Sequence, residues 1–217
     1  MPARAAGRLP GEEIDSLEAP IDYGTAMNDP IARFLKTYER AQKKDPGDHT
    51  RVALATADEN GRPSVRMVLL RGVDDRGFVF FTNYGSSKAH ELAANPQAAL
   101  CFYWESIKEQ VRVEGTVERA GSDESDAYFA SRERASQLAA WASKQSSPLE
   151  SRTQLLAEYL KVKARFAGRE VPRPDFWGGF RLRPQRIEFW SNQPHRLHDR
   201  VAFVREGDGW VKERLYP

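Results

Sequence analysis

Three side chains near the C-terminus have the types and the spacing to bind an anion. Arg196, His198 and Arg200 alternate in the segment Arg196-Leu-His-Asp-Arg200. If this segment is extended, the two-residue side-chain period places all three on one face. Like charges on one face repel, and a bound anion offsets that repulsion. With Trp190 six residues earlier, the segment indicates either a site for a flat phosphorylated ligand or a solvated strand face with Arg–Asp pairs.

A second group of basic and amide side chains recurs where predicted strands and helices end. Lys88 lies in the first turn of a predicted helix, where a lysine opposes the helix dipole unless an anion lies between it and the free amides. Thr82, Ser86 and Ser87 supply hydroxyls close by. We expect a phosphate at this helix N-terminus; the alternative is a solvent-facing lysine with a serine cap. The group comprises Arg66, Arg71, Lys88, Gln110, Arg132, Arg134 and Gln145.

Several other chemistries lack their sequence patterns. His195 and His198 have no adjacent carboxylate or thiolate cluster, so we expect no zinc site. No Ser-His-Asp or nucleophile-elbow pattern indicates covalent hydrolysis. No Gly-x-Gly-x-x-Gly or phosphate-loop signature indicates a dinucleotide or a triphosphate. Cys101 lies in an apolar run and reads as a buried, inert thiol.

Composition limits the partners. The 217 residues are 40% hydrophobic and 29% charged, with a net charge of +2, so no overall field attracts nucleic acid or an anionic membrane. No apolar run has the length of a membrane span, and the N-terminus lacks a signal-peptide pattern. We therefore expect a cytoplasmic protein with neither nucleic-acid nor membrane partners.

The elements that must position these side chains belong to one domain. Residues 1–27 contain scattered Pro and Gly and predict a flexible N-terminal arm, whereas 28–217 predict a single domain. Helices are expected at 30–43, 87–94, 123–131, 133–143 and 150–167. Strands are expected at 51–56, 64–71, 78–82, 98–104, 110–119, 180–183, 186–190, 197–205 and 210–215.

The order of these elements favours an α+β fold. Residues 110–119 alternate, with Val111, Val113 and Val117 on one face and charged residues on the other. Successive hairpins with helices inserted between them predict an antiparallel β-barrel with flanking helices rather than a doubly wound sheet.

Taken in order, several segments from about residue 29 to the last residue resemble the pyridoxine/pyridoxamine 5′-phosphate oxidase family. The segments are Arg66-Met-Val-Leu-Leu-Arg71, Phe80-Phe-Thr-Asn-Tyr-Gly-Ser-Ser-Lys88, Gln110-Val-Arg-Val-Glu-Gly115, Tyr128-Phe-Ala-Ser-Arg132, Ser136-Gln-Leu, Trp141-Ala-Ser-Lys-Gln-Ser-Ser147, Val171-Pro-x-Pro, Phe176-Trp-Gly-Gly-Phe180, Glu188-Phe-Trp190, Arg196-Leu-His-Asp-Arg200 and Glu213-Arg-Leu-Tyr-Pro217. The resemblance implies an FMN-binding split β-barrel and a homodimer with FMN at the subunit interface.

The resemblance also implies residue roles. Contacts to FMN fall on Arg66, Met67, Val68, Leu69, Arg71, Phe81, Thr82, Lys88, Gln110, Gln145, Ser146, Trp190 and Arg200. Contacts to the phosphorylated B6 vitamer fall on Arg71, Tyr128, Arg132, Ser136, Arg196 and His198. Arg196 and His198 take the catalytic role, positioning the vitamer on the side away from the flavin and assisting proton movement.

The implied activity is oxidation of pyridoxine 5′-phosphate, pyridoxamine 5′-phosphate or both to pyridoxal 5′-phosphate, with O2 as acceptor and H2O2 as product. Two alternatives stay open: a related split-barrel flavin oxidase acting on another aromatic metabolite, of phenazine type, and a non-catalytic carrier of flavin or pyridoxal phosphate.

The sequence departs from the family pattern at three places. Arg71 stands where lysine is usual, and the two side chains are not interchangeable at a hydrogen-bonding site. Ser87 stands where an arginine usually precedes the lysine, which removes a cation from the expected phosphate site. Residues 1–27 do not follow the pattern of the family's N-terminal arm.

Overall fold

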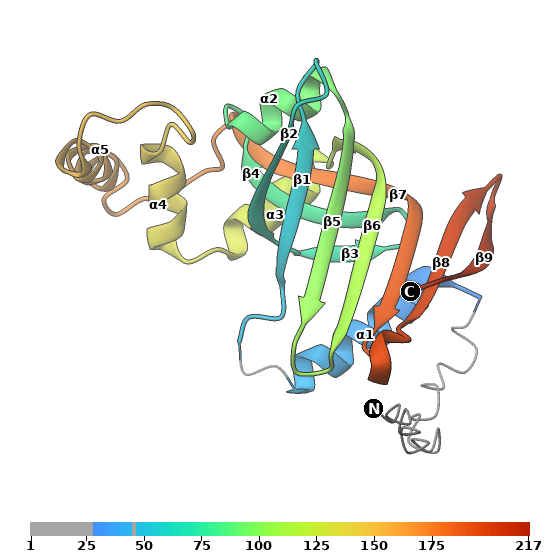
Figure 1. Ribbon diagram of the computed structural model, residues 1–217. Helices are drawn as coiled ribbons and strands as arrows, with labels where there is room; N and C mark the ends of the chain where they lie inside the picture. The colour runs from blue at the N-terminus through green and yellow to red at the C-terminus, as the bar shows by residue number, and fades with distance from the viewer. Residues whose placement is uncertain (1–27, 45–46) are drawn as a thin grey trace, which may run out of the picture.

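The computed structural model describes residues 28–44 and 47–217, which form an antiparallel sheet curled into a half-barrel with flanking helices (Figure 1). The predicted N-terminal arm, 1–27, lies outside the described residues. The strands are β1 Arg51–Ala57, β2 Pro63–Leu69, β3 Gly72–Asp74, β4 Gly77–Asn83, β5 Gln97–Trp104, β6 Glu109–Arg119, β7 Trp177–Ser191, β8 Asp199–Glu206 and β9 Gly209–Leu215. The helices are α1 Pro30–Lys44, α2 Ser87–Ala94, α3 Ser122–Ser131, α4 Arg134–Ala142 and α5 Arg152–Arg165, with a short 3₁₀ helix at Pro194–Arg196.

The strand order is β2-β1-β5-β6-β7-β4-β3, with β8 and β9 extending from β7. All described pairings are antiparallel. Strand β7 pairs with β4 along its first half and with β8 along its second, while β6 pairs with it from Phe180 to Ser191. The predicted α+β antiparallel barrel with flanking helices is confirmed.

Residues 180–183 and 186–190, predicted as two strands, belong to the single strand β7. The register with β6 shifts between Glu114 and Gly115, so that Gly115 lies opposite Pro184. A proline at a bulge removes no regular ladder hydrogen bond, and the chain therefore continues as one strand. A Cβ at Gly115 would lie 2.0 Å from the Arg183 carbonyl oxygen, so only glycine fits at this bend.

The main core fills the inside of the half-barrel and is closed by α1. Phe34 of α1 is fully buried, with ring centroids 4.8 Å from Phe78 and 5.0 Å from Phe102. A second cluster joins α3, α4 and α5 to the start of β7 through Phe129, Leu138 and Trp177. In Figure 1, α4 and α5 lie to one side of the sheet.

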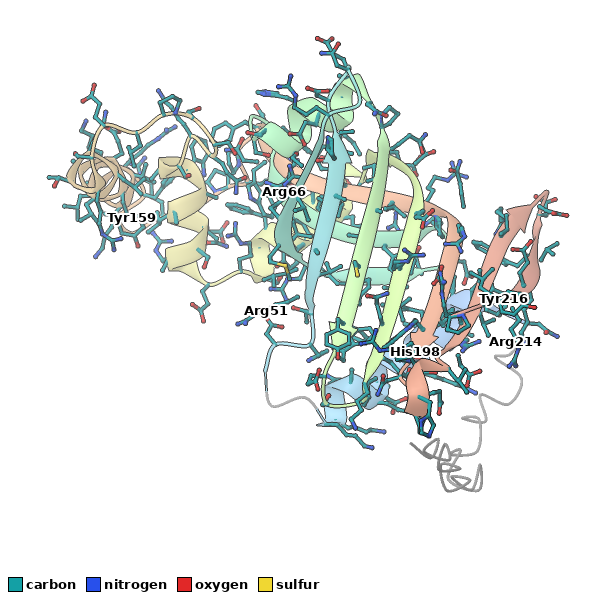
Figure 2. All side chains as sticks on the ribbon, viewed as in Figure 1. Arg51, Arg66, Tyr159, His198, Arg214 and Tyr216 are labelled. Carbon is teal, nitrogen blue, oxygen red and sulfur yellow. The ribbon has the colours of Figure 1, made fainter. Side chains whose placement is uncertain are left out.

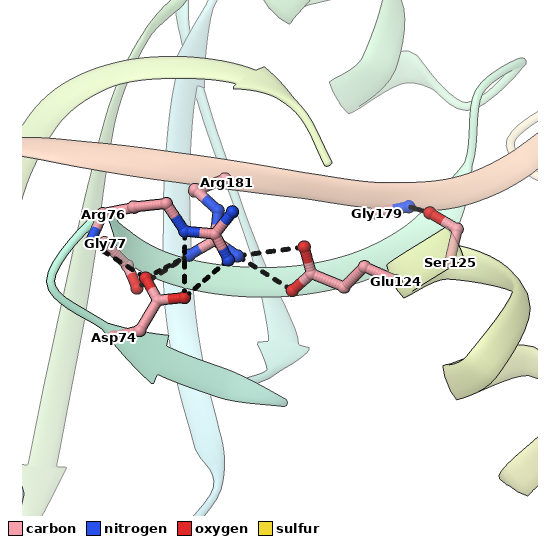
Figure 3. Close-up of polar contacts among 7 residues, drawn as sticks. All are labelled: Asp74, Arg76, Gly77, Glu124, Ser125, Gly179 and Arg181. Atoms are coloured by element: carbon pink, nitrogen blue, oxygen red, sulfur yellow. Dashed lines mark hydrogen bonds and ion pairs between the residues drawn. The ribbon is translucent and has the colours of Figure 1, made fainter. Parts of the chain in front are cut away.

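Helix α3 is fixed to the sheet by the buried Arg181 of β7 (Figure 3). Its guanidinium donates to Asp74 at 2.6 Å and to both carboxylate oxygens of Glu124 at 2.9 Å. Ser125 accepts a hydrogen bond from the backbone N–H of Gly179 at 3.1 Å. Bidentate pairing fixes orientation as well as distance, so this network sets the direction in which the next turn of α3, with Tyr128, faces the sheet.

Within the described residues, no helix combines the length and the apolar character that crossing a membrane requires.

Candidate active site

Most of the predicted site residues line one cavity of about 620 Å³ between β2, β4, α2 and α3. The structure brings together positions far apart in the sequence because α3 and the segment after α4 fold back against β4. The predicted residues that line this cavity are Met67, Val68, Leu69, Arg71, Phe81, Thr82, Lys88, Tyr128, Arg132, Ser136 and Gln145.

Lys88 is a buried cation in this cavity, with 7% of its surface exposed. Its Nζ donates to Thr82 Oγ1 at 3.1 Å and to Ser86 Oγ at 3.3 Å. No carboxylate of the described chain lies within ion-pair distance of this ammonium. Burial, followed by the charge of Arg66, lowers the pKa of Lys88. The solvent-facing lysine considered above is wrong, and Ser86, although it is the N-cap residue, makes no capping hydrogen bond with its side chain.

Arg66 lies beside the cavity, and its guanidinium is already paired with other side chains of the protein. Its guanidinium pairs with Glu91 at 2.9 Å and hydrogen-bonds to Ser64 at 2.6 Å and to Thr56. Burial favours the neutral form of Glu91, but hydrogen bonds from Thr56, Ser64 and Arg66 outweigh it and hold the pKa of this carboxyl below its usual value. Arg66 therefore adds positive potential next to Lys88, partly offset by Glu91.

Three nearly parallel aromatic rings form one wall of the cavity. Phe81 stacks on Tyr128 at 4.1 Å and on Trp177 at 5.6 Å, with interplanar angles of 24° and 10°. A guanidinium lies at each end: Arg71 is 5.9 Å from the Tyr128 ring centre, and Arg132 is 4.8 Å from that of Trp177. Two guanidinium groups beside a flat wall suit a ligand with an aromatic ring and a phosphate.

The segment after α4 closes the cavity through Gln145. Its side-chain oxygen accepts hydrogen bonds from Thr82 Oγ1 at 2.9 Å and from the Asn83 N–H at 3.3 Å. The following residue, Ser146, has a left-handed φ of 71° and does not line the cavity in this subunit. The turn thus holds Gln145 against the end of β4.

Asn83, Ser131, Glu133 and Trp177 also line the cavity but were not predicted as site residues. Each is adjacent in sequence to a predicted site residue or lies in one of the segments that resemble the oxidase family, and this position was the feature of the sequence that could have identified it. Conversely, Arg134 of the second basic group serves the fold: it donates to the carbonyls of Arg169 at 2.9 Å and Phe166 at 2.6 Å, near the end of α5.

The other predicted site residues gather around the start of β8. Gln110 pairs with Trp190 across β6 and β7, and Trp190 pairs with Arg200 across β7 and β8. The His198 ring lies 4.7 Å from the Trp190 ring. His198 and Arg200 border a separate pocket of about 430 Å³ with the C-terminal residues Tyr216 and Pro217, and Figure 2 shows His198 and Tyr216 in the same region.

The strand predicted at 197–205 begins later than expected, so the condition of a single extended segment from Arg196 to Arg200 is not met. Strand β8 begins only at Asp199. His195 and Arg196, both within the short 3₁₀ helix Pro194–Arg196, have left-handed φ values of 55° and 62°. The turn therefore replaces the alternation that would have put the three basic side chains on one strand face. His198 is held separately, because its Nδ1 accepts a hydrogen bond from the Gln193 N–H at 3.2 Å.

Glu188 is the buried centre of this second group, with only 2% of its surface exposed. Its carboxylate accepts hydrogen bonds from Arg112, from Arg186 at 2.8 Å and from Arg200 Nε at 2.9 Å. Burial pushes the pKa of Glu188 upward, but the hydrogen bonds from Arg186, Arg112 and Arg200 together outweigh it and hold the pKa below its usual value. Arg200 is thus fixed beside Trp190 by a buried carboxylate on the same face of the sheet.

Two family models match most of the chain. The model described as pyridoxamine 5′-phosphate oxidase matches residues 39–166, and that of the pyridoxine 5′-phosphate oxidase C-terminal dimerisation region matches residues 177–217. The chain belongs to the pyridoxamine 5′-phosphate oxidase family. The resemblance inferred from the sequence motifs is confirmed.

Individual members of the pyridoxamine 5′-phosphate oxidase family are similar over nearly the whole chain. A pyridoxine/pyridoxamine 5′-phosphate oxidase of Rubrobacter xylanophilus is 51% identical over 217 residues, 100% of both chains. One of Anaeromyxobacter dehalogenans is 56% identical over 193 residues, 89% of this chain and 98% of the other. The crystal structure of PhzG from Burkholderia lata 383 in complex with tetrahydrophenazine-1-carboxylic acid matches with a TM-score of 0.86 and 30% identity, covering 93% of this chain and 100% of that one.

In one subunit of this oxidase family member, the two groups of site residues are separated by the sheet. The register runs from Met67 to Ala53, Cys101, Arg112 and Glu188, on β2, β1, β5, β6 and β7. Adjacent strands lie about 4.8 Å apart, so Met67 at the cavity and Glu188 in the second group are about 19 Å apart along the sheet. The cavity and the Trp190 region therefore do not form one pocket within a subunit.

Within the described residues, the part of this sheet face formed by β2, β1 and β5 is largely apolar and has no covering helix, with Arg112 of β6 beside it. Val65, Met67 and Tyr103 are exposed on β2 and β5, and on this face the small side chains of Ala53 and Cys101 lie between them. In Figure 1, no helix lies in front of β1, β5 and β6. Exposed apolar surface of this kind marks an interaction site, and the match to the dimerisation region supports a homodimer.

Proposed function

We propose that this protein is an FMN-dependent oxidase that converts pyridoxine 5′-phosphate, pyridoxamine 5′-phosphate or both to pyridoxal 5′-phosphate, with O2 as acceptor and H2O2 as product. The observation that carries the proposal is a single cavity with two separate cationic positions, Lys88 on one side and Arg132 on the other. A flavin mononucleotide and a phosphorylated vitamer together bring two phosphates. Two relatives named pyridoxine/pyridoxamine 5′-phosphate oxidase, 51% and 56% identical to this chain, support the same function.

The residues present fit FMN. Lys88 is buried with hydroxyl partners alone, which leaves its charge available to a phosphate. Strand β2 is an edge strand, so the backbone N–H and C=O groups on its outer edge, along Met67, Val68 and Leu69, make no hydrogen bonds within the described sheet. We assign the phosphate to Lys88 and Thr82, with Arg66 behind them, and the ring system to the β2 edge and Gln145. When bound, FMN supplies the hydride acceptor for the C4′ carbon and passes the electrons to O2.

The vitamer phosphate is assigned to Arg132, Tyr128 and Ser136, with Arg71 at the other end of the aromatic wall. Arginine binds phosphate through parallel N–H bonds, which fixes the orientation of the pyridine ring as well as its charge. Holding the C4′ carbon at a set distance from the cofactor lowers the barrier through proximity and orientation.

We infer that the second group of residues completes the site of a partner subunit. In the proposed homodimer, Gln110, Trp190 and Arg200 of one copy close the flavin end of the other copy's cavity, and Arg196 and His198 cover the vitamer. The separation of about 19 Å between Met67 and Glu188 along the sheet, the exposed apolar face of β2, β1 and β5 and the dimerisation-region match support this arrangement. Ser146 and Gln110, which do not line the cavity within one subunit, are assigned to the same interface.

His198 has a defined hydrogen-bonding role in this arrangement. Because its Nδ1 accepts the Gln193 N–H, the neutral ring carries its proton on Nε2 and presents a donor there. Arg196 adds a positive charge that favours loss of a proton from the 4′ hydroxyl or amine. Together they would orient the vitamer and assist proton movement at its 4′ substituent.

The direct test is aerobic turnover of FMN-loaded protein with pyridoxine 5′-phosphate, following pyridoxal 5′-phosphate and H2O2 together. Equimolar appearance of both products is expected. Bound flavin without either product would overturn the proposal. An anaerobic mixing experiment separates the carrier alternative, because a carrier would leave the flavin oxidised whereas an oxidase would bleach it.

The structural similarity to PhzG favours a second candidate, oxidation of a non-phosphorylated aromatic metabolite of phenazine type. The cations Arg132 and Arg71 beside the aromatic wall argue for the phosphorylated substrate, because a ligand without phosphate leaves them unpaired. Comparing kcat/KM for pyridoxine 5′-phosphate with that for tetrahydrophenazine-1-carboxylic acid decides between the two. The cytoplasmic location stays a prediction from the sequence.

A further inference from the structure

Arg132 is a cation held in the cavity without a polar partner. In the described part of the chain no hydrogen bond or ion pair reaches its guanidinium, and its Nη1 atom is buried with no partner. Burial lowers the pKa of Arg132, which shows that the surroundings do not favour the charge. Buried polar groups in proteins are nearly always paired, so the position of this side chain requires another cause.

Aromatic rings supply that cause. The guanidinium carbon lies 4.8 Å from the centre of the Trp177 ring and 5.6 Å from that of Phe129. A cation over an aromatic face is attracted by the ring quadrupole, most strongly by tryptophan. Unlike a carboxylate, a ring can hold the guanidinium in place without neutralising its charge, which leaves its N–H groups free for an anion.

Trp177 is itself fixed. It is 7% exposed, its ring stacks on Phe81 at an interplanar angle of 10°, and it meets Phe129 edge-on at 5.1 Å. Its backbone carbonyl accepts a hydrogen bond from Arg173 at 2.8 Å, and its position pairs with Asn83 of β4. A ring held by packing on two sides and by the sheet gives the guanidinium a fixed surface.

We propose that Trp177 is a positioning residue that holds Arg132 in the cavity with its N–H groups free for the phosphate of the substrate. The proposal rests on the proposed function, because it takes the ligand to be a phosphorylated vitamer. Trp177 thereby sets the preference for phosphorylated over non-phosphorylated ligands.

The test measures binding rather than turnover. Calorimetry on FMN-loaded protein compares 4′-deoxypyridoxine 5′-phosphate with 4′-deoxypyridoxine, which lack the oxidisable group and differ only in the phosphate. Trp177→Leu is expected to weaken the phosphorylated ligand about tenfold, the loss typical of one desolvated cation–π contact, and to leave the other ligand unchanged. Trp177→Phe, which keeps a ring, should give an intermediate loss and serves as the test if the leucine variant does not fold.

Trp210→Leu is the matched control, because Arg205 lies 5.2 Å from the Trp210 ring on β9, away from the cavity. This control should not change the ratio of the two affinities. Equal weakening of both ligands by the Trp177 variants, or no weakening of either, would overturn the proposal, as would a wild-type protein that binds both ligands equally. Failure of turnover in a protein that still prefers the phosphorylated ligand would count against the oxidase function alone.

Discussion

Arg200 donates a 2.9 Å hydrogen bond from Nε to Oε1 of Glu188, a buried carboxylate on the same sheet face as Arg200 and Trp190. Arg200 also donates to the backbone carbonyl of Tyr216 at 2.9 Å, so its guanidinium is held from two sides. A cation fixed in this way can meet a ligand of a partner subunit without first losing side-chain freedom. Glu188 therefore fixes the proposed flavin contact from the same face of the sheet.

Glu188→Gln should weaken FMN binding to the dimer, because the neutral amide holds Arg200 less firmly. The expected loss is about 3- to 10-fold in the dissociation constant, typical of one charge-assisted hydrogen bond, and is measured by quenching of flavin fluorescence. Glu114→Gln is the control, since that more exposed carboxylate pairs with Arg186 at 3.2 Å and does not reach Arg200. If both substitutions weaken FMN binding equally, Glu188 has no specific role in positioning Arg200.

The same substitution should change how stability depends on pH. The pKa of Glu188 is lowered from its ordinary 4.5, so its contribution is fully present above that pH and is lost as the pH falls through the folded-state pKa. The difference in free energy of unfolding between wild type and Glu188→Gln should therefore be largest near neutral pH and shrink below pH 4.5. Urea unfolding at a series of pH values measures it. A gap that stays constant or widens on acidification would contradict the prediction.

Ser87→Arg should tighten FMN binding. Ser87 is exposed at the first residue of α2, next to the buried Lys88, so an added guanidinium lies near the assigned phosphate. A gain of about 3- to 10-fold in affinity is expected from one more charge-assisted contact. Ser87→Ala, which adds no charge, should leave the dissociation constant unchanged. An arginine variant that binds FMN no better than wild type would argue against a phosphate at this helix end.

Arg196→Ala should lower turnover much more than FMN content, because its assigned contact is to the vitamer. We expect kcat/KM to fall by at least about 100-fold, as for loss of a charged group that both binds and assists proton movement. His195→Ala is the matched control, being the neighbouring residue with a similar left-handed φ of 55° and no assigned contact. Parallel loss of flavin and activity in the Arg196 variant would refute the assignment.

Arg181→Met should destabilise the fold and loosen α3. Removing the buried guanidinium takes away the bidentate partner of Glu124 and one of the two arginines that pair with Asp74, the other being Arg76 (Figure 3), which costs about 2–4 kcal/mol in free energy of unfolding. KM for the phosphorylated vitamer should rise as well, because Tyr128 lies one turn further along α3. Arg183→Met on the same strand is the control. Its exposed pair with Glu118 at 3.5 Å contributes less than about 1 kcal/mol.

Local pattern determined much of this protein. Ser87 to Ala94 is the helix expected between Ser86 and Asn95-Pro96, although the Ser86 side chain makes no capping hydrogen bond, and the alternation of Val111, Val113 and Val117 gives the buried face of β6 as expected. These features depend on neighbours within a few residues, where capping and side-chain periodicity act. The family-like segments also indicated most of the residues that line the cavity, because those segments keep their order along the chain.

Tertiary structure decided what depends on distant partners. The strands predicted at 180–183 and 186–190 form one continuous strand, β7, because a bulge opposite Gly115 accommodates the residues between them. The left-handed turn at Arg196 interrupts the segment before β8, whose residue pattern suggested an extended chain. Trp177 meets Arg132 only because β7 returns beside α3. The distance between the cavity and the Trp190 group follows from strand order, which periodicity does not encode, since the same alternating strands can pair in many orders.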